Sequence, residues 1–201
     1  MINQNKPIRI GFTGAHRTGK TTLAKMCANA LNLPYIPSIS SKVYQDMGID
    51  PSERLSFLDR LKVQNQILES QYKLWESQES FVTDRTPYDF VMYLLADINN
   101  NINNTTELAE GFNTQEIVEY ITYCQSLCDS YFSNIILVEP AIDLVPEAGK
   151  ANSNQLYIDH LNALIKGLTT GKDNVKLLPK NIVELDSRVN WVKNYLFEVY
   201  L

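Results

Sequence analysis

The chain has 201 residues, of which 44% are hydrophobic and 20% are charged, and its formal net charge is −5. This length and apolar content suit one globular domain spanning 1–201. The negative charge argues against a nucleic-acid polymer as the main partner, because phosphate backbones attract basic surfaces. It leaves room for a local basic pocket that binds one small anion. No apolar run approaches the length of a membrane span, so we expect no membrane partner.

The three cysteines, Cys27, Cys124 and Cys128, lack the spacing of a metal site. Paired zinc ligation would need two more ligands, and the only histidines, His16 and His160, lie far away in the sequence. Packed, reduced thiols are therefore expected, which indicates a reducing compartment and a cytoplasmic protein.

Apolar periodicity predicts strands that alternate with helices. In the N-terminal half, the pattern predicts a strand over 8–13, a helix over 21–31, a short strand over 35–38, a long helix over 52–77, a strand over 80–85 and a helix over 86–98. After a polar, turn-prone block at 99–104 come a helix over 114–132, a buried strand over 134–140, a loop over 141–153, a helix over 154–168, a strand over 175–178 and a helix over 187–200. Such alternation predicts an α/β fold whose parallel sheet is covered by helices on both faces. Ligands of such sheets bind beyond the carboxyl ends of the strands.

The segment directly after the first strand fits the phosphate-loop pattern G-x-x-x-x-G-K-[ST] in every fixed position. Glycines allow tight turns and a close approach of backbone amides to phosphate oxygens, and the following helix directs its free N–H groups at the anion. Lys20 is expected to bridge the β- and γ-phosphates of ATP, and the Thr21 hydroxyl to bind Mg²⁺. The predicted ATP-binding residues are Gly14, Ala15, His16, Arg17, Thr18, Gly19, Lys20, Thr21 and Thr22.

Two residues inside this loop are not fixed by the pattern. Arg17 can place a guanidinium beside the transferring phosphoryl group, where charge develops. We favour this catalytic role over that of a solvent-facing arginine near bound anions. His16 has two readings of nearly equal weight: a part in the chemistry, or a hydrogen bond or ring contact that only supports the loop.

A second motif, Asp84-Arg85, stands at the end of the strand predicted over 80–85. Asp84 can hold Mg²⁺ through water or accept a proton from an attacking hydroxyl, and Arg85 can clamp a phosphate with two hydrogen bonds. The alternative is a strand-end salt bridge followed by a helix cap. Beside a phosphate loop we favour the functional reading, with Lys20, Arg17, Asp84 and Arg85 as catalytic residues.

The segments "GAHRTGKTTLA" and "TDRTPYDFVMYLLA" resemble the small nucleoside and nucleotide kinases related to thymidylate kinase. They are closer still to the branch that contains the ribosylnicotinamide kinase domain and phage deoxynucleoside monophosphate kinases. The resemblance implies a P-loop NTPase fold of the nucleoside monophosphate kinase-like type: a three-layer α/β/α sandwich with a mainly parallel five-stranded sheet. It also implies that Asp84 and Arg85 contact the phosphate acceptor, and some thymidylate kinases carry an arginine at the place of Arg17.

One departure from this family concerns the lid, which usually carries arginines. The corresponding lid-like loop at about 140–153 has Lys150 as its sole cation. Three explanations remain: Arg17 stabilises the charge alone, Lys150 assists it, or the protein transfers phosphate poorly. We favour the first.

The acceptor is expected between the helix over 52–77 and Asp84. Arg60 and Gln64 share a helix face, so Arg60 can bind an acceptor phosphate while Gln64 reads a base edge. An exposed helix with ordinary polar residues is the equally weighted alternative. Arg188 either lies over the adenine of ATP, as the loop before the last helix does in related kinases, or is a surface residue.

These observations favour an ATP-dependent kinase that transfers the γ-phosphoryl group to a (deoxy)nucleoside monophosphate, because Asp84-Arg85 and Arg60 supply charge for a second phosphate. A nucleoside such as ribosylnicotinamide is the close alternative acceptor. A nucleotide-binding regulatory ATPase is the alternative from another class. A homodimer is compatible with the sequence.

Overall fold

Five parallel strands form the centre of the molecule. The computed structural model describes residues 6–50, 55–101, 114–141 and 154–200. The strands lie in the order β2-β3-β1-β4-β5, and each neighbouring pair is parallel, which confirms the predicted sheet. Their bounds are Arg9–Thr13 for β1, Tyr35–Ile36 for β2, Phe81–Thr83 for β3, Asn134–Leu137 for β4 and Val175–Leu177 for β5.

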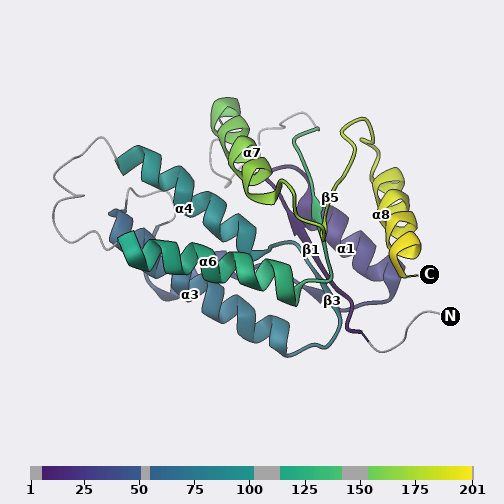
Figure 1. The fold of residues 1–201 in the computed structure, drawn as a ribbon, viewed down its shortest axis with the longest axis horizontal. Helices are drawn as coiled ribbons and strands as arrows, with labels where there is room; N and C mark the ends of the chain where they lie inside the picture. Colours follow the sequence, from purple (N-terminus) through teal and green to yellow (C-terminus); the bar gives the residue numbers. More distant parts are fainter. Residues whose placement is uncertain (1–5, 51–54, 102–113, 142–153, 201) are drawn as a thin grey trace.

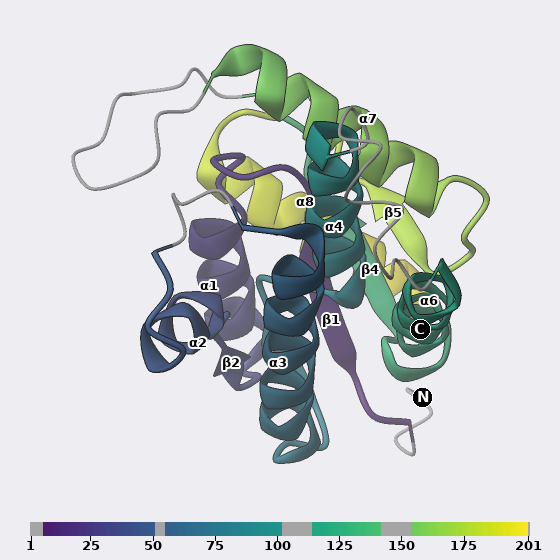
Figure 2. The same cartoon turned by 90° about the vertical axis from the view of Figure 1, so that its left-hand side faces the viewer.

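Helices cover both faces of this sheet (Figures 1 and 2). Helices α1 and α8 pack on one face, and α3, α4, α6 and α7 lie on the other. Their bounds are Lys20–Leu31 for α1, Ser40–Asp46 for α2, Phe57–Glu76 for α3, Pro87–Asn101 for α4, Thr114–Tyr131 for α6, Gln155–Thr169 for α7 and Leu185–Tyr200 for α8. This is the three-layer arrangement predicted from the alternating pattern.

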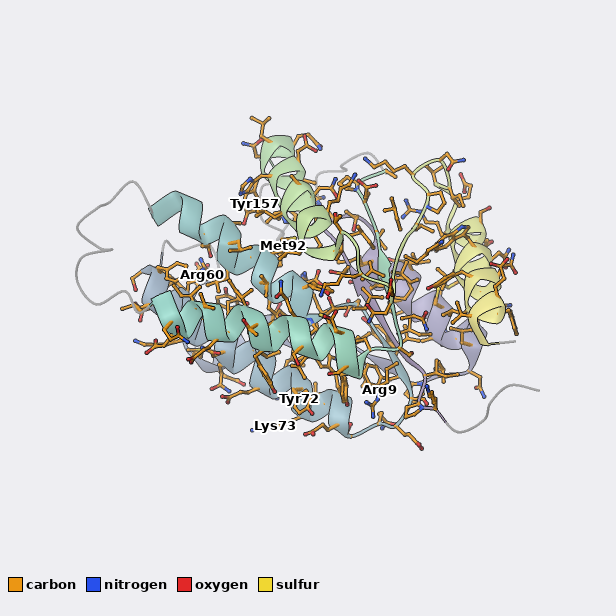
Figure 3. All side chains as sticks on the ribbon, viewed as in Figure 1. Arg9, Arg60, Tyr72, Lys73, Met92 and Tyr157 are labelled. Atoms are coloured by element: carbon orange, nitrogen blue, oxygen red, sulfur yellow. The ribbon has the colours of Figure 1, made fainter. Side chains whose placement is uncertain are left out.

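The alternation of side chains along the strands explains the two layers. In β4, Ile136 belongs to the core cluster under α1 and α8, whereas its neighbours Ile135 and Leu137 belong to the cluster under α3, α4, α6 and α7. Figure 3 shows the second layer filled by side chains, with Met92 of α4 among them; Met92 is fully buried. Because helices cover both faces of the sheet, β4 carries apolar side chains on both faces.

Three features differ from the sequence expectation. Helix α2 was not predicted, because it is short and buries only Val43. The long helix α3 begins at Phe57, where the Ser56 hydroxyl accepts a hydrogen bond from the Asp59 amide, rather than at residue 52. Helix α4 continues to Asn101, so the polar block at 99–104 does not end it where the turn-prone residues suggested. Within the described segments, no helix is both long and apolar enough to cross a membrane.

Candidate functional site

The phosphate loop connects β1 to α1 at the carboxyl edge of the sheet, and its glycines are needed there. Gly14 has φ 143°, and a Cβ at this position would lie 2.2 Å from the Val138 carbonyl oxygen. Gly19 has φ 85° and directly precedes the first helical residue, Lys20. Arg17 adopts φ 63°, which is uncommon for a residue with a side chain. The sequence motif therefore corresponds to a tightly turned loop.

Lys20 lies buried inside this loop. Its Nζ donates to the carbonyl oxygens of Gly14, at 2.7 Å, and Ala15, at 2.5 Å. Burial, and then the nearby Arg85 guanidinium, lower the pKa of Lys20 to about 7. The ammonium is thus held where an anion would stabilise its charged form.

Thr21 and Asp84, the two residues predicted to bind Mg²⁺, lie side by side. The Thr21 hydroxyl donates to Asp84 Oδ2 at 2.5 Å, and the Ser38 amide donates to Asp84 Oδ1 at 3.0 Å. These are hard oxygen ligands of the kind that Mg²⁺ prefers, and Mg²⁺ usually takes the rest of its shell from water and substrate phosphates. The donor set therefore fits a magnesium–nucleotide complex. No group of three or more histidine, cysteine or acidic side chains that could hold a metal without a nucleotide occurs in the described part of the chain.

Arg85 extends from the end of β3 between the loop and a neighbouring cavity. Its Nη1 donates to Tyr93 Oη at 3.3 Å and to Asp89 Oδ1 at 3.4 Å, and its side chain is 22% exposed. Burial disfavours its charge, but Tyr93 and Asp89 outweigh this effect and raise its pKa. Arg85 is therefore a fixed cation at the mouth of the cavity.

Asp89 is a residue that the functional reading of the sequence missed. It is fully buried in the first turn of α4 and accepts hydrogen bonds from the loop, from Thr86 and from Arg85. The run Thr86-Pro87-Tyr88-Asp89 has the spacing of a capping box, which would have predicted its bond to the Thr86 amide. Its contacts with the loop join residues far apart in sequence, so no local pattern indicates them.

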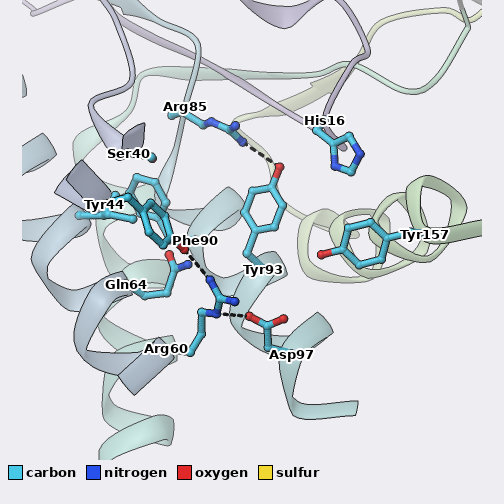
Figure 4. Close-up of a pocket in the computed structure, with 11 residues that line it drawn as sticks. His16, Ser40, Tyr44, Arg60, Gln64, Arg85, Phe90, Tyr93, Asp97 and Tyr157 are labelled. Atoms are coloured by element: carbon cyan, nitrogen blue, oxygen red, sulfur yellow. Dashed lines mark hydrogen bonds and ion pairs between the residues drawn. The ribbon is translucent and has the colours of Figure 1, made fainter. Parts of the chain in front are cut away.

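The cavity beside Arg85 measures about 280 Å³ and lies between α2, α3, α4 and α7 (Figure 4). Arg85 and His16 stand at one end, and Arg60 with Asp97 at the other. Ile67 and Phe90 supply apolar walls. The lining residues are His16, Ser40, Tyr44, Arg60, Gln64, Ile67, Arg85, Phe90, Tyr93, Asp97 and Tyr157. A cavity with apolar walls and a few polar groups is the usual form of a small-molecule site.

Arg60 and Gln64 both line this cavity, and their exposed fractions of 14% and 4% contradict the alternative of an exposed polar face, while their contact with an acceptor stays a prediction. Arg60 Nε lies 2.6 Å from Asp97 Oδ2, and its Nη1 donates to Tyr44 Oη at 2.5 Å. Burial raises the pKa of Asp97, while Arg60 opposes that rise. Gln64 is only 4% exposed, and its buried Oε1 has no hydrogen-bond partner among the described residues. This end of the cavity therefore offers a paired charge and an unused acceptor.

His16 lies at the opposite end and contacts Tyr157 of α7, with ring centroids 5.6 Å apart. Burial, followed by the charges of Lys20, Arg85 and Arg17, lowers the pKa of His16 to about 4. The imidazole is thus neutral at physiological pH. It is also one of the side chains that line the cavity.

The remaining predicted residues fall in different places. Arg17 is half-buried, and Thr22 is exposed on the first turn of α1. Arg188 is buried, and its guanidinium donates to the carbonyl oxygens of Ile182, at 2.8 Å, and Thr18, at 3.3 Å. It is therefore not a surface residue, and it contacts the phosphate loop through the Thr18 carbonyl oxygen. Lys150 lies outside the described residues.

Comparisons with known proteins agree with this fold. A family model described as AAA domain matches residues 9–126. Deoxyadenosine kinase from M. mycoides, solved with the products dCMP and a flexible dCDP, superposes with a TM-score of 0.62 at 14% identity, covering 96% of this chain and 100% of that one. Thymidylate kinase from Ehrlichia chaffeensis superposes with a TM-score of 0.60 at 12% identity, covering 95% and 98%.

NadR protein in complex with NR gives a TM-score of 0.58 at 13% identity. The alignment covers 94% of this chain and 49% of NadR, so this chain spans about half the length of that protein. Identities this low establish the shared fold and no more. No curated protein sequence matches the chain. The P-loop kinase-like fold expected from the two motifs is therefore confirmed.

Proposed function

We propose that this chain, which belongs to the AAA domain family matched by its residues 9–126, is an ATP-dependent kinase acting on a nucleoside or a nucleoside monophosphate. The observation that carries this proposal is the placement of Arg85. It lies between a complete phosphate loop and a cavity of about 280 Å³. Phosphoryl transfer requires a donor and an acceptor held next to each other, with positive charge near the transferred group, and a cation between the two sites is consistent with both needs.

Each site residue has a role in this reaction. Lys20 binds the phosphates of ATP, and Arg17 supplies charge to the transferring group as it separates from ADP. Thr21 and Asp84 would hold Mg²⁺, which neutralises phosphate charge when bound. Asp84 also orients the acceptor, and Arg85 fixes it at the mouth of the cavity. The chemistry consists of positioning and charge stabilisation, without a covalent enzyme intermediate.

The charges of the cavity favour a nucleoside as the acceptor. The sequence favours a monophosphate, because Asp84-Arg85 together with Arg60 offers charge for a second phosphate. In the structure Asp97 lies 2.6 Å from Arg60, so this charge is balanced at the end of the cavity away from the phosphate loop. An acceptor phosphate would lie at the other end, beside the phosphate loop, where Arg85 is the lining arginine and is itself paired with Asp89. A neutral base can use the donors of Arg60 and the acceptor of Gln64.

We further propose that the base lies between Phe90 and the α3 residues Gln64 and Ile67, and that the sugar lies nearer to Tyr93. In this orientation the reacting hydroxyl is directed to Arg85 and the phosphate loop. The buried Gln64 Oε1 supports this arrangement, because an unpaired buried acceptor is unfavourable until a ligand donates to it.

The test is ADP release from MgATP with a panel of nucleosides and their 5′-monophosphates, with Lys20→Ala as the inactive control. Release that depends on a nucleoside supports the proposal, and the chain is a monophosphate kinase if only the monophosphates stimulate it. Equal ADP release with and without every acceptor would instead identify a regulatory ATPase and contradict the kinase. No release and no ATP binding would contradict both.

A further inference from the structure

Asp89 has more hydrogen bonds than a helix cap requires. Its Oδ2 accepts from the Thr86 amide at 2.9 Å, from the Thr86 hydroxyl at 3.1 Å and from the Thr13 hydroxyl at 2.9 Å. Its Oδ1 accepts from the Gly14 amide at 3.3 Å and from Arg85 Nη1 at 3.4 Å. All five groups are donors, which matches the acceptor-only character of a carboxylate.

The two oxygens thus have different tasks. Oδ2 completes the first turn of α4 and ties it to the end of β1. Oδ1 receives one donor from the first residue of the phosphate loop and one from the arginine at the mouth of the cavity. Asp89 is 0% exposed, so these bonds are shielded from water and keep most of their directional strength.

A second capping box in the same chain shows what capping alone looks like. On α3 the Ser56 hydroxyl accepts from the Asp59 amide at 3.1 Å and donates to Asp59 Oδ2 at 2.7 Å. The Asp59 side chain is 52% exposed, and its remaining contact is an ion pair with Lys62 one turn along. None of these Asp59 bonds reaches another helix or strand, whereas the bonds of Asp89 connect α4 to β1, to the phosphate loop and to Arg85.

We propose that Asp89 is a positioning residue that fixes the ATP-binding loop and the acceptor arginine relative to each other. It acts through Gly14 and Arg85 and does not touch either substrate. By holding both donors on one oxygen, it sets the separation between the γ-phosphate of ATP and the acceptor hydroxyl. The expected changes in kcat and KM rest on the kinase activity proposed above, whereas the expected change in the binding of an ATP analogue does not.

Asp89→Asn separates the two tasks of the carboxylate. Three donors surround Oδ2, so the amide oxygen of asparagine should occupy that place and keep the helix cap. The NH₂ group then faces the Gly14 amide and Arg85, where donor meets donor and the guanidinium is released. We expect the acceptor KM to rise at least about tenfold, and kcat to fall about tenfold or more. The buried donor–donor contacts should also lower the thermal midpoint, but the variant should stay folded because the helix cap is kept.

A double-mutant cycle with Arg85→Ala tests whether Asp89 acts through this arginine. In the Arg85→Ala background, Asp89→Asn should add less than about threefold to the acceptor KM. The matched control is Asp59→Asn, which alters the other capping box and should leave both KM and kcat unchanged. Fully additive effects, or an unchanged acceptor KM in Asp89→Asn, would overturn the proposal.

Asp89→Ser provides a second variant, because its single hydroxyl can accept from the Thr86 amide and leaves Oδ1 without a replacement. It should show the same kinetic changes. If both variants fail to fold, Asp89 is a residue of the fold and the positioning role is wrong.

Calorimetric binding of a non-hydrolysable ATP analogue, without acceptor, keeps this inference separate from the proposed function. Asp89→Asn should weaken that binding a few-fold through the Gly14 contact, whether or not an acceptor is known. If the parent chain binds the analogue but phosphorylates nothing, the proposed function fails while the loop contact remains testable. If the analogue binds Asp89→Asn as tightly as the parent chain, the inference fails instead.

Discussion

Two side chains of the phosphate loop have pKa values lowered mainly by burial, Lys20 to about 7 and His16 to about 4. For each of them Arg85 is among the nearby cations that add to this effect. A bound triphosphate would bring several negative charges to the same place and favour the protonated forms. Binding of ATP is therefore expected to be linked to protons.

For Lys20 the sign of this linkage can be worked out. At pH 8 the Lys20 side chain of the free protein is mostly a neutral amine. A bound nucleotide raises the pKa of Lys20, so binding takes up a proton. At pH 6 it is already protonated and uptake should be small. Calorimetry of an ATP analogue in two buffers with different ionisation enthalpies measures the uptake. Lys20→Met should abolish it at pH 8, while His16→Asn should not; uptake that survives Lys20→Met contradicts this assignment.

Arg17 gives the second prediction at this scale. If its guanidinium stabilises developing charge, Arg17→Ala should lower kcat by on the order of 10²-fold, with a smaller change in the KM for ATP. Lys25→Ala is the matched control, since it removes an exposed positive charge from the outer part of α1. Steady-state kinetics with a fixed acceptor decide the matter. A change confined to KM would limit Arg17 to ATP binding.

At the scale of elements, the cavity depends on how α2, α3 and α4 meet. The apolar pattern of α3 predicted the helix and placed Arg60 and Gln64 on one face, which the structure confirms. The partners of Arg60 could not be predicted in the same way. Tyr44 lies on a helix that has too few apolar residues to give a pattern, and Asp97 lies on another helix at no fixed spacing from Arg60.

The Arg60–Asp97 pair makes a prediction about stability. The two side chains are only 14% and 21% exposed, so removing one partner leaves a poorly hydrated charge. Arg60→Met should lower the free energy of unfolding by about 2 kcal/mol, and the double variant Arg60→Met/Asp97→Leu should lose less than this. Urea unfolding at neutral pH provides the measurement. Equal or greater loss in the double variant would show that the pair is not held as a unit.

The same variants bear on the acceptor. Arg60→Met should raise the KM for the nucleoside and leave the KM for ATP unchanged, because Arg60 lies at the end of the cavity away from the phosphate loop. A comparable rise in both constants would mean that the two sites are not separated as described.

At the scale of the whole molecule, the order of the strands and the long helices was predictable, whereas the short helix α2 and several boundaries were not. Alternating strands and helices predicted the parallel sheet, and two strand ends predicted the site at its carboxyl edge. The long-range bonds of Asp89 and Arg188 escaped prediction, because contacts between distant residues leave no local periodicity. The sequence thus predicted the two motifs that meet at this edge, and the structure added Asp89 and Arg188, which contact the phosphate loop.

Folding stability should depend on pH through His16. Its pKa is about 4 in the folded protein, below the ordinary 6.5 expected for an unfolded chain. Between these values the unfolded state binds a proton that the folded state does not, so stability falls as pH falls from 6.5 towards 4. Urea unfolding across this range should show a shallower decline for His16→Asn than for the parent chain. Parallel declines would contradict the lowered pKa.

Arg188 connects opposite ends of the sequence. Its guanidinium holds the Thr18 carbonyl oxygen across 170 positions. During synthesis the ribosome therefore releases the glycine-rich turn long before the arginine that braces it. We expect a nucleotide to bind the nascent polypeptide weakly until α8 has emerged. Only then can Arg188 donate to the Thr18 carbonyl oxygen and hold the loop.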